Sequence, residues 1–402
     1  MTNPKADLLA HLESMAARYQ DRWTLSACGV TVGRRSIPAL LDKNANSPGS
    51  NTASVLLISG LSGSADDVAL ARRALDSTPS DDAGPGNHIS LSAIPDCNPD
   101  GLRDLSTGYP PLGEFFYNAE EPEKRYLWRW ICFLAPTLIL ELRSGEAVSW
   151  QSNEAGSNLA SALARSGGRV ENESLLDSLG SGSPDGLGPI PGLRLTSPPE
   201  SLDDELGKLW KLLSEQPGLR EASPARQVLE ARSARSHLEV AHILASVYGY
   251  QLDPVNYTQG VGISGRLQLY ELSKTGESPA SGIVDLVEPY VSGSTPMFGE
   301  RVGGANLAGL IWGRELSAAT GDPRYSDLIV AVANRYQPGV DGGAPPPCDP
   351  DFRTEDMFMA GVMLGRAFGI TGETRVPTGT PASASSPMTL SRARGEAVRG
   401  SS

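Results

Sequence analysis

Apolar and polar positions divide the chain into two parts with different periodicities. In the first part, apolar side chains recur at helical spacing over residues 6–19, and mainly apolar runs of strand length occupy residues 55–59, 89–94 and 137–142. A helical segment separates each of these runs from the next. Strands that alternate with helices predict an α/β domain whose largely parallel sheet carries helices on its faces.

The second part has helical periodicity and no strand of normal length. Residues 166–205 are crowded with Gly, Pro and Ser and predict an excursion or linker. Helical segments in 206–260 either complete the first domain, which we place at 1–165, or connect it to the next one. Residues 261–375 predict paired helices, and 376–402 predict a disordered tail because they hold few large apolar side chains.

Net charge, cysteine spacing and short motifs limit the partners, cellular location and cofactors that we expect. With 34 basic and 47 acidic residues the net charge is −13, which disfavours nucleic acid and anionic membranes as partners. The four cysteines show no CxxC spacing and predict reduced, buried thiols: Cys28, Cys97, Cys132 and Cys348. The N-terminus lacks the pattern of a signal peptide, so we expect a cytoplasmic protein. No P-loop and no GxGxxG after a strand occurs, and we expect no cofactor.

Four ordered segments of the first part resemble the zinc carboxypeptidase family. They are GVTVGRRSIPALL (29–41), VLLISGLSGSADD (55–67), IPDCNPDGL (94–102) and TLILELRSG (137–145). The third carries the family's Asn-Pro-Asp-Gly turn intact. The resemblance covers about residues 1–165 and implies a carboxypeptidase-like mixed or parallel sheet with flanking helices.

The resemblance also implies a zinc site, and this chain departs from it. The family's loop places a histidine and a glutamate three residues apart, and a second histidine arrives from the later strand. The corresponding positions here are Ser62, Ala65 and Arg143. A serine hydroxyl is a poor zinc ligand, alanine offers no donor atom, and an arginine cation repels the metal. We therefore expect a carboxypeptidase-like domain without its metal, although Asp66 or Asp67 could still supply an oxygen ligand to a non-standard site.

Other polar residues offer weaker candidates. His237 and His242 lie five residues apart on a predicted helix, which turns them away from one another. His11 is predicted to be solvated on the first helix, and His88 to lie at the surface. The cations that could bind an anionic ligand are Arg34, Arg35, Arg103 and Arg143, and the candidate substrate-binding residues are Arg34, Asn98, Asp100 and Arg143.

Two later segments resemble the unsaturated glucuronyl and rhamnogalacturonyl hydrolases, which are helical (α/α) toroids. They are residues 305–336 and 355–373, and the first contains the turn TGDPRY at 320–325. Mechanically, Gly321 would end one helix in a left-handed cap and Asp322 would cap the next. The resemblance ends at residue 373, and the remaining helices of a complete toroid have no counterpart after it. It therefore implies a partial toroid.

The same resemblance assigns a catalytic proton donor, Asp356, beside Glu355. Asp356 would protonate the double bond of an unsaturated uronic acid, and Glu355 would raise its pKa as a neighbouring like charge. Alternatively, both acids only favour a helix N-terminus, while Met357, Phe358 and Met363 fill the core. A second aspartate, expected within residues 302–305, is absent there.

These interpretations leave three hypotheses. The leading one is a degenerate hydrolase-family protein that binds a carbohydrate or peptide ligand or keeps a residual hydrolase activity. The alternatives are a glycan hydrolase that uses Asp356 and a metallocarboxypeptidase with a non-standard metal site. A half toroid would leave apolar helix faces open, so we also expect a homo-oligomer or a partner that covers them.

Overall fold

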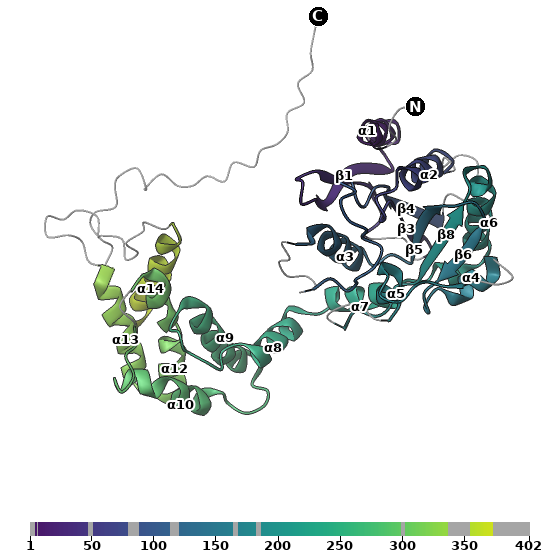
Figure 1. Cartoon of the computed structure of the whole chain (residues 1–402). Helices are drawn as coiled ribbons and strands as arrows, with labels where there is room; N and C mark the ends of the chain where they lie inside the picture. The colour runs from purple at the N-terminus through teal and green to yellow at the C-terminus, as the bar shows by residue number, and fades with distance from the viewer. Residues whose placement is uncertain are drawn as a thin grey trace, which may run out of the picture. The chain divides into compact units, whose positions relative to one another are not determined.

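The computed structural model divides the chain into two compact units, Met1–Ala234 and Arg235–Ser402, which are described separately (Figure 1). The residues that it describes are 5, 7–46, 51–78, 88–112, 120–163, 168–181, 186–298, 302–336 and 354–372. The division lies after α7 of the first unit, within the 206–260 range that the sequence left open between domain completion and connector.

The first unit is built on one mixed sheet. Its strands are β1 (Trp23–Val30), β2 (Ser36–Asp42), β3 (Ala53–Ser59), β4 (Ile89–Ile94), β5 (Leu138–Ser144), β6 (Ser149–Ser152), β7 (Gly168–Arg169) and β8 (Gly192–Ser197). They lie in the order β1-β2-β4-β3-β5-β8-β6-β7. The central strands β4, β3, β5 and β8 are parallel. The pairings β1–β2, β2–β4 and β6–β8 are antiparallel, and β6 pairs in parallel with β7. The α/β prediction is confirmed.

Helices cover both faces of this sheet, because its central strands are apolar on both sides. All seven residues of β3 are buried; Val55 and Leu57 face one core, and Leu56 and Ile58 face the other. The first core is closed by α1 (Leu8–Arg18), α2 (Ala65–Asp76), α4 (Ser157–Leu163) and α6 (Leu202–Glu215). The second is closed by α3 (Pro122–Leu134), α5 (Leu175–Ser181) and α7 (Pro224–Ser233) (Figure 1).

The range 166–205, predicted as an excursion or linker, contributes to the sheet. It holds β7, α5, β8 and the short helix η3 (Pro199–Ser201), and β8 pairs in parallel with β5 from Ile139↔Gly192 to Ser144↔Ser197. The sequence did not predict β8, because Gly, Pro and Ser residues surround it and leucine occurs at only two of its positions. Arg194, between the two leucines, is buried and charged, and it is held by ion pairs.

The second unit is helical throughout its described residues. Its α-helices are α8 (His237–Val247), α9 (Tyr257–Ser273), α10 (Ala280–Val291), α11 (Gly304–Leu307), α12 (Gly313–Thr320), α13 (Arg324–Ala333) and α14 (Glu355–Thr371). Gly321 adopts a left-handed φ of 77° after α12, and Asp322 Oδ1 accepts a hydrogen bond from Arg324 N at 2.9 Å. Gly321 therefore ends α12 as predicted, and Asp322 binds the first backbone N–H of α13, although Pro323 takes the N-cap position. The (α/α) toroid stays a prediction.

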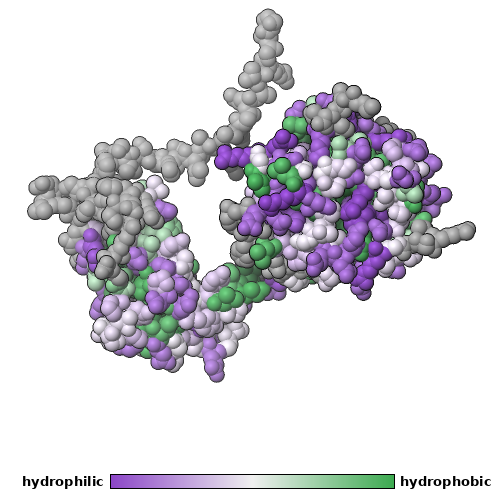
Figure 2. Space-filling model, in the orientation of Figure 1, coloured by the Kyte–Doolittle hydropathy of each residue, from purple (hydrophilic) through white to green (hydrophobic). Residues whose placement is uncertain are grey.

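Helix α8 exposes apolar side chains, and they appear as a green area over it in Figure 2. None of its residues is buried, and its exposed apolar residues are Leu238, Val240, Ile243, Leu244 and Val247. Helix α8 lies outside the range 261–375 for which open helical faces are expected, and a partner that covers those faces stays a prediction. Within the described part of the chain, no helix combines the length and the apolar character that crossing a membrane requires.

Candidate functional site

The candidate site lies where three parallel strands end. Loop 60–64 follows β3, the turn 96–101 follows β4, and Arg143 with Ser144 ends β5. Carboxyl ends of neighbouring parallel strands meet at one edge of a sheet, and this edge is where α/β folds bind ligands. The loop and the turn touch there, because a Cβ atom added to Gly63 would lie 2.9 Å from Gly101 Cα.

Asp67 closes the loop after β3. Its Oδ2 accepts a hydrogen bond from Ser62 Oγ at 2.9 Å, and its Oδ1 accepts one from the backbone N–H of Ser144 at 2.8 Å. The side chain is buried at the start of α2, where a carboxylate is favoured by the helix dipole. Both oxygens are thus engaged with protein donors, so Asp67 links β3, α2 and β5.

Arg143 and Arg194 share one buried carboxylate, Glu141. Arg143 Nε lies 2.7 Å from Glu141 Oε1, and Arg194 Nε lies 3.0 Å from Glu141 Oε2. Glu141 and Arg194 are each 1% exposed, and Arg194 also pairs with Glu171. Facing positions 141 and 194 on paired strands place the opposite charges side by side. The result is a charge network within the polar end of the second core.

The ion pairs of this network shift the pKa values of Arg143 and Glu171. Burial lowers the pKa of Arg143, but Glu141, Glu171 and Asp67 raise it by more, so that this pKa lies above its ordinary value. For Glu171, burial raises the pKa, whereas the hydrogen bond and charge of Arg194 lower it by more. Both groups therefore stay charged at neutral pH.

Three guanidinium nitrogens of the network keep unused hydrogen-bonding capacity. Arg143 Nη2, Arg194 Nη2 and Arg194 Nε are buried, and none finds a hydrogen-bond partner among the described residues, although Arg194 Nε lies in the ion pair with Glu141. Buried donors normally have partners, and leaving one without an acceptor costs about 1–3 kcal/mol. An acceptor oxygen from a ligand or a water would remove this cost.

Asn98 and Asp100, predicted to bind substrate, hold loops together in the structure, and their contact with a substrate stays a prediction. Asn98 Nδ2 donates to Leu61 O at 3.1 Å and to Arg103 O at 2.6 Å, and Asn98 Oδ1 accepts from Gly101 N. Asp100 Oδ2 accepts from Gly33 N at 3.0 Å, and its Oδ1 lies 3.2 Å from Arg35 Nε. These bonds fix the turn against its neighbours.

The other cations predicted for anion binding are not gathered around Arg143. Arg34 is exposed in the β1–β2 turn with a φ of 62°. Arg35 Nε pairs with Asp100 Oδ1 on the turn, and Arg103 Nη1 donates to Glu120 O at 3.2 Å. The structure thus places Arg143 beside Ser62 and Asp67, and it ties Arg35 and Arg103 to other loops.

The donor set at this edge does not fit the zinc that the resemblance implies. Ser62 and Arg143 are bound to carboxylates, and Ala65 has no donor atom. Across the described ranges, no group of three or more His, Cys, Asp and Glu side chains is arranged to hold a metal ion. Asp66 is exposed on the first turn of α2, and Asp67 is engaged as described above.

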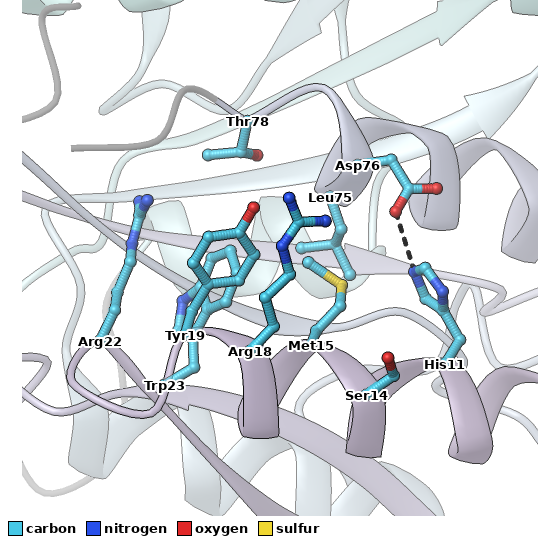
Figure 3. A pocket seen from close by; sticks show the side chains of 10 residues that line it. All are labelled: His11, Ser14, Met15, Arg18, Tyr19, Arg22, Trp23, Leu75, Asp76 and Thr78. Atoms are coloured by element: carbon cyan, nitrogen blue, oxygen red, sulfur yellow. Dashed lines mark ion pairs between the residues drawn. The ribbon is translucent and has the colours of Figure 1, made fainter. Parts of the chain in front are cut away.

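The histidines lie away from this edge. His11 was predicted to be solvated, but it is partly buried, and its Nε2 lies 3.2 Å from Asp76 Oδ1 (Figure 3). The pair borders a cavity of about 130 Å³ between α1 and the end of α2. The correction has a simple cause: α1 packs against α2, which covers the face that carries His11. His88 is partly buried, and both His237 and His242 are exposed on α8.

Three of the four cysteines are buried thiols, as predicted, and Cys348 lies outside the described residues. Burial raises the pKa of Cys97, which keeps this thiol protonated. Burial acts in the same direction on Cys28. Neither thiol is thus prepared to act as a nucleophile.

The predicted glycosidase site is only partly described. Glu355 is exposed at the start of α14, and the side chain of Asp356 lies outside the described residues. Of the three side chains that the alternative interpretation places in the core, Met363 is buried, whereas Met357 and Phe358 are 81% and 68% exposed. The catalytic role of Asp356 stays a prediction.

Sequence reasoning did not find Glu141, Glu171 and Arg194 as members of the site. A signal was present for two of them: Glu141 stands between leucines in LILELRS, and Arg194 stands between leucines in GLRLTS. Charged side chains are almost never fully buried unless they are paired. Glu171 follows β7 in a segment that was predicted as a linker.

No protein-family model matches the chain, and no curated protein matches it. Solved structures similar to its N-terminal half are metallocarboxypeptidases. The carboxypeptidase A from Helicoverpa armigera is 16% identical with a TM-score of 0.38, covering 53% of this chain and 73% of that one. The metallo-carboxypeptidase from Burkholderia cenocepacia is 13% identical with a TM-score of 0.38, covering 51% and 67%.

A third similar structure is the metallo-carboxypeptidase from Pseudomonas aeruginosa in complex with (2-guanidinoethylmercapto)succinic acid. It is 13% identical with a TM-score of 0.39, covering 53% of this chain and 69% of that one. Because all three TM-scores lie below 0.5, the functional proposal rests on the side chains of the site.

Proposed function

We propose that the first unit is a hydrolase-like domain that binds a carboxylate-bearing ligand without a resident zinc ion. One observation carries the proposal: Arg143, at the position of an expected histidine ligand, is paired with buried Glu141 at 2.7 Å. A guanidinium stays protonated at all physiological pH values and cannot ligate a metal. Arg143 therefore cannot replace the histidine ligand, and its Nη2, which has no hydrogen-bond partner among the described residues, is the group that could bind an anion.

The chemistry of the network indicates which ligand it would take. A guanidinium presents N–H groups in a fork that matches the two oxygens of a carboxylate. Arg143 is 27% exposed, and its Nη2 has no hydrogen-bond partner among the described residues. A free peptide C-terminus or an acidic sugar would supply the missing acceptor, and Ser62 beside Asp67 could contact the remainder of the ligand.

Isothermal titration calorimetry with a peptide library tests this proposal. Each peptide is compared with its C-terminally amidated form, which lacks the carboxylate charge. We expect binding of free-carboxylate peptides that weakens about tenfold or more in Arg143→Gln. The matched control is Arg73→Gln, which removes an exposed cation from the far end of α2 and should bind as the unmodified chain does.

Mass spectrometry of the same mixtures separates binding from hydrolysis. We expect the peptides to remain intact, with no loss of a C-terminal residue. Equal binding of free and amidated peptides would contradict the anion site, and release of the C-terminal residue would contradict a metal-free binding domain.

A further inference from the structure

The second unit contains a small cavity with a neutral lining, distinct from any site described above. Its volume is about 230 Å³, and it lies between the end of α8 and the start of α9. The lining residues are Val247, Tyr248, Gly249, Tyr250, Gln251 and Gln259. The lining includes two tyrosines and two glutamines, and none of the lining residues carries a charge.

The backbone holds the two tyrosines in fixed positions. Gly249 stands between them with a φ of 84°, which favours glycine, and a Cβ atom there would lie 2.6 Å from the backbone of Gly262. This close approach joins the turn to α9. Tyr248 ends α8, and its backbone N–H donates to Leu244 O at 2.9 Å. The backbone that carries both tyrosines is therefore held by the end of α8 and by its close approach to α9.

Arg266 orients the second ring. Its guanidinium stacks over Tyr250 at 3.8 Å from the ring centroid, and its Nη1 donates to Gly249 O at 2.7 Å. Through these contacts Arg266 holds the Tyr250 ring against the turn and covers one face of the ring. Tyr248 and Tyr250 are nevertheless both 57% exposed. A large exposed aromatic surface that is held rigidly offers contact area at a low cost in conformational entropy.

We propose that this cavity binds a neutral carbohydrate. A pyranose ring has an apolar C–H face that can lie on a tyrosine ring, and hydroxyl groups at its edge that both donate and accept hydrogen bonds. The amide groups of Gln251 and Gln259 likewise both donate and accept, which matches hydroxyl groups. No lining residue carries a charge that would select an acidic glycan, and the neighbouring Arg266 is engaged with the Tyr250 ring and Gly249 O. A proline-rich peptide, which offers mainly acceptors, would use only half of the amide capacity.

Affinity electrophoresis of the full chain tests the proposal. The gels contain xylan, glucomannan, soluble starch or hydroxyethyl cellulose, with polygalacturonate as the acidic comparison, and decaproline is titrated separately. We expect retardation by at least one neutral polysaccharide and none by polygalacturonate. Tyr250→Ala should weaken binding about fivefold or more, because it removes the ring on which the sugar lies.

The matched control is Tyr257→Ala, which removes a tyrosine that is also exposed but does not line the cavity. It should retain binding. If Tyr250→Ala has a lowered melting temperature, Gln251→Ala, at an exposed position, replaces it and should also weaken binding. Absence of retardation by every neutral polysaccharide, equal loss in the Tyr257 control, or binding of decaproline alone would overturn the proposal.

Discussion

Glu141 Oε1 lies 2.7 Å from Arg143 Nε, and the other oxygen of the same carboxylate lies 3.0 Å from Arg194 Nε. One buried carboxylate thus pairs with two arginines on neighbouring strands, and Glu171 supplies the second negative charge, beside Arg194. Transfer of ions from water into a protein interior is costly, and pairing compensates it only while both partners are present. The stability of the first unit should therefore depend on this arrangement.

Arg194→Met removes one partner and leaves Glu141 with only Arg143. Because Arg194 is 1% exposed, we expect the free energy of unfolding to fall by about 3–5 kcal/mol. Urea denaturation followed by tryptophan fluorescence measures this change. The control Arg169→Met changes an arginine that is 64% exposed and should stay within about 0.5 kcal/mol of the unmodified chain. Equal effects of the two substitutions would contradict a stabilising network.

Glu171 should make stability depend on acid pH. Its folded pKa lies below the ordinary value of 4.5 because Arg194 binds its charged form. The unfolded chain then binds more protons than the folded chain as the pH falls through this region, so that acid destabilises the fold. This contribution is fully present above pH 4.5 and is lost below it. Glu171→Gln should flatten the acid limb of a stability profile, and an unchanged slope below pH 4.5 would count against the pairing.

The helix contacts of the second unit can be tested with two glycines. A Cβ atom at Gly313 would lie 2.3 Å from the carbonyl oxygen of Tyr325, so Gly313→Ala should cost about 1–3 kcal/mol by forcing α12 away from α13. A Cβ atom at Gly365 in α14 meets nothing within 4 Å, and Gly365→Ala should stabilise by about 0.5–1 kcal/mol. Thermal unfolding by circular dichroism measures both. Shifts of the same sign would contradict this packing.

The glycan-hydrolase alternative is tested with unsaturated uronyl disaccharides. Loss of the ultraviolet absorbance of their double bond reports the reaction that Asp356 would start. Glu355, its expected partner, is exposed rather than enclosed in an apolar cavity, so we expect no loss of absorbance. Turnover by the full chain that is abolished in Asp356→Asn would establish the alternative.

Periodicity predicted the central strands, because β3, β4 and β5 are apolar runs with helices between them. It did not predict β8, since a strand that keeps Arg194 in its interior departs from the apolar pattern, and the pairing of Arg194 with Glu141 arises only after folding. The contacts of the candidate site likewise form only after folding. The order of the family-like segments was enough to identify Ser62, Ala65 and Arg143 as the positions of the expected zinc ligands. The hydrogen bonds of Asp67 could not be predicted in this way, because its partners Ser62 and Ser144 lie 5 and 77 positions away in the sequence.

The zinc content of the purified full chain tests the central claim most directly. The chain is dialysed against zinc and then against buffer, and inductively coupled plasma mass spectrometry gives zinc atoms per chain. Ser62→His/Ala65→Glu/Arg143→His restores the ligand types and serves as the comparison. We predict no retained zinc in the unmodified chain and near-stoichiometric zinc in the triple variant. One tightly held zinc ion per unmodified chain would contradict the account.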